Sequence, residues 1–88
     1  MARPSVELHP EAIAEARAAY QWYAERDRAI SQVQSAPERW PVHLHATRKY
    51  LFRRFPYSVI YRVTETAIQV LAVAHGRRRP GYWRTRQF

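Results

Sequence analysis

Residues 50–63, Tyr50-Leu-Phe-Arg-Arg-Phe-Pro-Tyr-Ser-Val-Ile-Tyr-Arg-Val63, and residues 68–75, Ile68-Gln-Val-Leu-Ala-Val-Ala-His75, decide the fold of this chain. Both runs are rich in aromatic and β-branched residues, which favour strands. They lead into Gly76-Arg-Arg-Arg-Pro-Gly-Tyr-Trp83, a segment dense in arginine and aromatic residues. No upstream segment is as rich in strand-forming residues. We therefore expect a sheet here, covered by the preceding part of the chain.

Three strands are expected in the second half of the chain. Arg48–Phe55 alternates between two faces, Pro56 interrupts it, and Tyr57–Val63 resumes the alternation. After a turn at residues 64–67, Ile68–Ala74 is apolar at nearly every position. This pattern is typical of a central strand that is covered on both sides.

The first half predicts one short strand and two helices. Ser5–Leu8 alternates polar and apolar residues, and Pro10 stands where a first helical turn accepts proline. An alanine-rich helix is expected up to about Arg26, and a shorter one at Asp27–Ser35, ended by Pro37. The predicted fold class is therefore α+β: an N-terminal strand, a helical hairpin and a three-stranded antiparallel meander in one small sheet.

The length and composition predict one small domain spanning residues 1–88. A chain of this length buries roughly 60–65% of its unfolded surface. It contains no cysteine, so neither a disulfide framework nor a thiolate metal site is expected. The sequence shows no secretory leader and no apolar run long enough to span a membrane. We therefore expect a cytoplasmic protein without a membrane partner.

The net charge of +8 is concentrated in the second half of the chain. Before residue 48, five arginines stand against six acidic residues, a sum of −1. From Arg48 onward, nine arginines and Lys49 stand against Glu65 alone, a sum of +9. Such an electropositive unit attracts nucleic acid or an acidic protein partner.

Several enzymatic sites are disfavoured by the residues present. His43 and His45 are two positions apart, but the nearest carboxylate in sequence is Glu38, so no metal site is expected. The basic half has only Glu65, which argues against catalysis by paired carboxylates. Ser58 lacks the glycine-flanked turn of a serine hydrolase. We expect no cofactor.

Four segments, in this order, resemble the RelE/ParE superfamily, the toxins of type II toxin–antitoxin modules. The last two are most similar to its ParE-like, plasmid-stabilisation branch. The segments are Val6-Glu-Leu-His-Pro-Glu-Ala12 with Ala24-Glu25-Arg26, then Ala36-Pro-Glu-Arg-Trp-Pro41, then Arg53-Arg-Phe-Pro-Tyr-Ser-Val-Ile-Tyr-Arg62, and Val70-Leu-Ala-Val-Ala-His-Gly-Arg-Arg-Arg-Pro-Gly-Tyr-Trp83.

The chain departs from this family pattern in its helices. Where the family has a loop and most of a long second helix, only residues 27–35 are present. The resemblance therefore implies a shortened second helix, or else a break in the backbone near residues 26–29 where a loop is missing.

The resemblance implies a toxin that binds DNA gyrase and stabilises its cleaved-DNA state without catalysis. Target contacts would then lie in the helical hairpin and in the C-terminal strand and tail. Arginine recognises phosphate and carboxylate through its planar fork, and aromatic side chains add stacking and contact area. The expected target-binding residues are Arg77, Arg78, Arg79, Tyr82 and Trp83.

A RelE-type messenger-RNA interferase, which cuts RNA on the ribosome, is the alternative. Metal-free RNA cleavage needs a proton acceptor, a proton donor and cations over the phosphate, which His75, Arg78 and Tyr82 would supply. Ser58 stands near the position where those enzymes commonly have an arginine, which weakens this interpretation. A second alternative is a non-toxic relic that retains only antitoxin binding. Whether the chain is an enzyme stays open.

Both toxin hypotheses imply a hetero-oligomer with an antitoxin. In this family a partly disordered, acidic antitoxin segment folds across the toxin, and the basic half of this chain would attract it. The expected antitoxin-binding residues are Arg53, Arg54 and Arg62.

Overall fold

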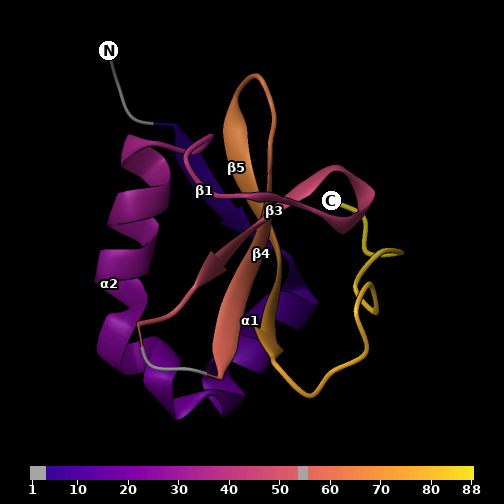
Figure 1. The fold of residues 1–88 in the computed structure, drawn as a ribbon. Helices are drawn as coiled ribbons and strands as arrows, with labels where there is room; N and C mark the ends of the chain where they lie inside the picture. The colour runs from indigo at the N-terminus through magenta and orange to yellow at the C-terminus, as the bar shows by residue number, and fades with distance from the viewer. Residues whose placement is uncertain (1–3, 54–55) are drawn as a thin grey trace.

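Two helices cover one face of a five-stranded sheet, and the C-terminal tail lies across the other (Figure 1). The computed structural model describes residues 4–53 and 56–88. The strand order is β1-β5-β4-β3-β2, with β1 parallel to β5 and the other neighbours antiparallel. The strands are β1 (Ser5–Leu8), β2 (Val42–His43), β3 (Thr47–Leu51), β4 (Tyr57–Val63) and β5 (Ala67–His75).

The α+β fold class is confirmed, and so are the N-terminal strand and the antiparallel meander β3-β4-β5. The expected number of strands is wrong, because Val42–His43 forms a further edge strand paired with β3. A two-residue strand is too short to show an alternating pattern in sequence. Strand β3 also ends at Leu51, earlier than the expected Phe55.

The helix boundary expected near Arg26 is wrong. Helix α1 spans Pro10–Ala18, and α2 runs without interruption over Tyr20–Ser35, through residues 26–29. The two are separated at Ala19, whose φ of −97° and ψ of 101° are extended. The second helix is thus the longer of the two, with 16 residues against 9, and its backbone has no break near residues 26–29. As expected, it ends just before Pro37.

The sheet has an apolar core on each face. The face under α1 and α2, here called the helix face, gathers Trp22, Tyr50, Phe52, Val59, Tyr61 and Val73 among its buried side chains. The opposite face, here called the tail face, buries Ile60, Leu71, Ala72, Ala74 and Trp83. Strand β5 contributes to both cores, which confirms the prediction of a central strand covered on both sides.

Strand β5 contains a β-bulge opposite β4, which changes the alternation of its side chains between the two faces of the sheet. Ile60 pairs with Ala72 and Tyr61 pairs with Val70, so Leu71 is the additional residue of a bulge.

Within the described residues, no helix is long and apolar enough to cross a membrane.

Candidate functional site

The C-terminal tail, residues 76–88, is held to the sheet from its first residue onward. The Gly76 N–H donates a hydrogen bond to the Pro56 carbonyl at 2.7 Å. At Gly81 a φ of +81° turns the chain back over the tail face, in a left-handed conformation that favours glycine. A Cβ at Gly81 would also come within 3.4 Å of His45 Nε2.

Trp83 anchors the returning tail. Its side chain is buried, with 2% exposed, and its ring lies 6.0 Å from the His43 ring and 5.9 Å from the His45 ring. In this structure Trp83 therefore packs the tail against the sheet and offers no surface to a target. Its expected role as a target contact stays a prediction that its burial disfavours.

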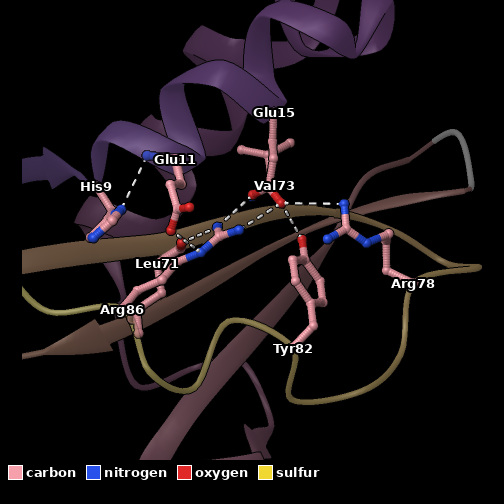
Figure 2. A network of polar contacts seen from close by, with 8 residues as sticks. All are labelled: His9, Glu11, Glu15, Leu71, Val73, Arg78, Tyr82 and Arg86. Carbon is pink, nitrogen blue, oxygen red and sulfur yellow. Dashed lines mark hydrogen bonds and ion pairs between the residues drawn. The ribbon is translucent and has the colours of Figure 1, made fainter.

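Glu15 of α1 is the centre of the polar contacts that hold the tail (Figure 2). Its Oε2 accepts hydrogen bonds from Tyr82 Oη at 2.6 Å and Arg86 Nη2 at 3.0 Å. Its Oε1 accepts from Arg86 Nη1 at 2.8 Å and from the Val73 N–H at 3.1 Å. Burial raises the pKa of Glu15, but the hydrogen bonds from Arg86 and Tyr82 outweigh burial and leave the pKa below its ordinary value.

These contacts close the open edge of β5. Strand β1 pairs with β5 only as far as Val70, so the backbone of β5 beyond that point lacks a strand neighbour on this side. Glu15 accepts from the Val73 N–H, and Arg86 Nη1 donates to the Leu71 carbonyl at 2.8 Å. Two charged side chains thus satisfy backbone groups that would otherwise need a strand or water.

Three consecutive arginines, Arg77, Arg78 and Arg79, form the exposed turn that follows β5, here called the arginine turn. The Arg78 guanidinium lies 3.9 Å from the centre of the Tyr82 ring, and its Nη1 is 3.8 Å from Glu15 Oε2. Within the described part of the chain, the side chains of Arg77 and Arg79 have no hydrogen-bond or ion-pair partner. The turn therefore presents two unengaged guanidinium groups and one that is partly engaged.

The residues considered for RNA cleavage line one small pocket, here called the turn pocket. Its volume is about 80 Å³, and Lys49, Ser58, His75, Arg78, Arg79 and Tyr82 are among its lining residues. His75 Nδ1 accepts a hydrogen bond from the Arg77 N–H at 3.0 Å, and the Tyr82 hydroxyl donates to Glu15. Burial and the neighbouring Glu15 carboxylate raise the pKa of Tyr82 well above its ordinary value.

The comparisons with known proteins decide the family. A family model for the ParE toxin of type II toxin-antitoxin system, parDE, matches residues 6–80. The chain belongs to the ParE toxin family. Among curated proteins, no sequence matches this ParE-family toxin.

Two solved structures share the fold of this ParE-family toxin. A double mutant of the E. coli toxin RelE in the free state has 16% sequence identity and a TM-score of 0.71, with 86% of each chain covered. A chain of the chromosomal ParDE TA system from P. aeruginosa has 20% identity and a TM-score of 0.63, covering 83% of this chain and 96% of that one. At these identities the two structures support the fold alone.

Arg53 and Arg62, two of the expected antitoxin-binding arginines of this ParE-family toxin, lie toward opposite ends of the sheet. Arg53 follows β3 and is exposed, whereas Arg62 lies near the far end of β4 and donates to Gln69 Oε1 at 3.0 Å and 3.3 Å. Arg54 lies outside the described residues. The expected role of all three stays a prediction.

Glu15 and Arg86 are the two residues of the site that sequence reasoning missed. They lie 71 residues apart, and nothing in the local pattern links them. The available signal was the spacing of Glu11 and Glu15, which places two carboxylates on one side of a helix. Arg86 contacts both, with its Nε 3.1 Å from Glu11 Oε2.

Proposed function

We propose that this ParE-family toxin acts by binding DNA gyrase and that the arginine turn is part of its contact surface. The observation that supports binding over catalysis is the engagement of Tyr82. Its hydroxyl proton is directed at Glu15, and its raised pKa makes it a weaker proton donor to a leaving group. The same carboxylate lies 3.8 Å from Arg78 Nη1, so two of the three residues that a nuclease would need contact Glu15.

The unengaged arginines support the proposed location of the contact. Arg77 and Arg79 are exposed and project from a turn that is fixed by β5 on one side and by Gly81 and Trp83 on the other. Because the turn is already held in place, it loses less conformational entropy when it contacts a partner. Arginine is also well suited to bind carboxylate and phosphate groups of a protein–DNA complex.

The partner that restrains the toxin would be a cognate antitoxin, giving a hetero-oligomer in the cytoplasm. Family membership supports this, because the family is that of toxins of a toxin-antitoxin system. The net charge of +8 favours a partner segment that is acidic.

A supercoiling assay with purified gyrase tests the proposal. The wild-type chain should inhibit supercoiling, and Arg77→Glu combined with Arg79→Glu should raise the inhibitory concentration at least about tenfold. Arg39→Glu is the control, because it reverses the charge of an exposed arginine that lies outside both helices and outside the tail. Unchanged inhibition by the double variant, or an equal loss in the control, would overturn the assignment of the arginine turn.

The alternative of an mRNA interferase is favoured by the gathering of Lys49, His75 and Arg78 around the turn pocket. If it is correct, the chain shortens mRNA on translating ribosomes, and His75→Ala abolishes the cleavage while gyrase is unaffected. A relic that only binds antitoxin would show neither activity, and its expression alone would leave growth unchanged.

A further inference from the structure

The C-terminal tail carries charge of one sign only. Residues 76–88 contain five arginines and no acidic residue. Glu11 and Glu15 of α1 offset the charge of Arg86, whose side chain is 9% exposed. The other four arginines of the tail are exposed: Arg77, Arg78, Arg79 and Arg84. Among the described residues, only Arg78 of these four has an ion-pair partner, Glu15 at 3.8 Å. The tail therefore presents a concentration of exposed positive charge.

Strand β3 extends this positive surface beyond the tail. Lys49 lines the turn pocket together with Arg78 and Arg79, and no carboxylate is among the described lining residues. The side chain of Glu15 is 14% exposed, and its carboxylate already accepts a hydrogen bond from Tyr82 Oη at 2.6 Å (Figure 2). An anionic partner therefore meets these cations with little competition from the carboxylates of the chain itself.

The aromatic side chains of the tail are occupied by contacts within the chain. Trp83 is 2% exposed, and the Arg78 guanidinium lies 3.9 Å from the centre of the Tyr82 ring. Phe88 packs edge-on against His9, which lies at the other end of the polar network from Arg78 (Figure 2). Proteins that bind single-stranded nucleic acid stack its bases on exposed aromatic rings. The arginine turn offers cations without such a stacking surface.

The backbone of the tail is held in a series of turns. The Arg78 N–H donates to the His75 carbonyl at 3.0 Å, and the Arg84 N–H donates to the Gly81 carbonyl at 3.0 Å. Residues 76–88 form no helix and no strand. Base edges in the major groove are read mainly by a helix or a two-stranded ribbon. The exposed arginines of these turns therefore suit phosphate groups, which carry no sequence information.

We propose that the exposed arginines of the tail, together with Lys49, bind the sugar-phosphate backbone of duplex DNA directly and without reading its sequence. This deepens the proposed function, on which it rests for its biological setting. It names the DNA held by gyrase, rather than gyrase itself, as the partner of the arginine turn. Duplex DNA carries one negative charge per about 1.7 Å of its length on its outer surface, so it needs no aromatic side chain for recognition.

Direct binding to DNA would be weak when the toxin is alone and effective when gyrase is present. A few phosphate contacts supply modest affinity, which falls as the salt concentration rises. Once another surface of the toxin is bound to gyrase, the contact with the DNA becomes intramolecular and is favoured by a high effective concentration. A toxin that contacts both partners stabilises the complex in which they are held together.

Fluorescence anisotropy of a labelled DNA duplex, titrated with the chain in the absence of gyrase, tests this inference. We expect a slope of about −3 to −4 for the logarithm of affinity against the logarithm of salt concentration, since each phosphate contact contributes about −0.9. Arg77→Ala combined with Arg79→Ala should make this slope less steep by about 1.8 and weaken binding at least about tenfold at low salt.

Arg39→Ala is the control for the loss of positive charge. Arg39 is exposed and its guanidinium lies over the ring of Trp40, which packs against the core of the helix face. Arg79→Ala alone should make the slope less steep by about 0.9, whereas Arg39→Ala should leave it unchanged. An equal change in both variants would indicate unspecific attraction by net charge and would overturn the inference.

Replacement by lysine separates DNA phosphates from carboxylates of a protein partner. Lysine binds phosphate as a point charge, whereas a forked contact with a carboxylate needs the guanidinium group. Arg77→Lys combined with Arg79→Lys should therefore keep the salt slope and retain affinity for the duplex within about threefold. A loss as large as that of the alanine variant would contradict simple phosphate binding.

The remaining outcomes separate this inference from its alternatives. An unchanged slope in the double alanine variant would overturn it. Tighter binding of single-stranded RNA of the same length would also overturn it, and would support the mRNA interferase instead. If the chain inhibits supercoiling but does not bind the duplex, direct DNA contact is refuted while gyrase binding stands. If it binds the duplex but leaves supercoiling unaffected, the inference stands and the proposed function is refuted.

Discussion

The two faces of the sheet are covered by very different amounts of chain. On the helix face, α1 and α2 supply 25 residues, and the core there is formed by many apolar side chains. On the tail face, the covering segment after Gly81 depends on one buried aromatic residue, Trp83, and on the polar contacts of Glu15. The helix face thus distributes its stability over many contacts, whereas the tail face concentrates it in a few groups next to the candidate site.

Trp83→Ala should give the largest effect. Loss of a buried tryptophan removes its apolar contacts and leaves a cavity, so we expect a fall of about 3–5 kcal/mol in the free energy of unfolding. Amide exchange at Val73 should also accelerate, because the tail that holds Glu15 and Arg86 in place is released. Urea denaturation and NMR-detected exchange measure both.

The matched variant on the helix face is Trp22→Ala, which replaces another buried tryptophan, 5% exposed. It should cost less stability than Trp83→Ala, because many other side chains share the core of the helix face, and it should not selectively expose the Val73 amide. If Trp83→Ala lowers the free energy of unfolding no more than Tyr23→Ala does at an exposed position, then Trp83 does not hold the tail face together.

Glu15→Gln should have an intermediate effect. The substitution keeps the shape of the side chain but leaves the Arg86 guanidinium, whose side chain is 9% exposed, without its main counter-charge. We expect a loss of about 2 kcal/mol at neutral pH, since a partly buried charge that loses its partner is costly. Glu65→Gln, an exposed carboxylate in the β4–β5 turn, is the control and should be neutral.

The pH dependence provides an independent check on Glu15. Its pKa in the folded chain lies below the ordinary value of 4.5, so the unfolded chain binds more protons in this acidic range. Its contribution to stability is therefore present above pH 4.5 and is lost as the pH falls through the folded pKa. The stability difference between wild type and Glu15→Gln should shrink in acid, and a constant difference would contradict the role of the charge.

Arg77→Glu combined with Arg79→Glu should have the smallest effect on stability. Neither side chain has a partner among the described residues, so we expect the free energy of unfolding to change by less than about 0.5 kcal/mol. A much larger loss would mean that the arginine turn is part of the structural contacts of the tail face. In that case the supercoiling assay would have to be repeated with variants that keep the fold.

Much of the fold could be predicted from local patterns. Tyr57–Val63 alternates clearly and Pro37 ends a helix by steric restriction, so both boundaries agree with the structure. Ala19 could not be identified as the break between helices, because alanine is the strongest helix former and carries no signal for an extended conformation. The additional residue of the bulge at Leu71 is likewise set by pairing with β4 and not by its own type.

The candidate site was predicted only where its residues are neighbours in sequence. The arginine turn is visible as three consecutive arginines, but the difference between Arg78 and its two neighbours depends on Glu15 of the distant helix α1. A groove lined by Trp40, Val42 and Leu51 also escaped prediction, because these residues come together only where β2 pairs with β3.

Part of the C-terminal tail lies beyond the region that matches the family model, and this affects how other family members can protect the edge of β5. The family match ends at residue 80, whereas Arg86, which satisfies the Leu71 carbonyl, lies beyond it. A relative whose chain diverges after that point must supply another donor for this carbonyl, or leave it to water. We therefore expect the protection of this edge of β5 to differ among ParE toxins with the residues that follow the shared region.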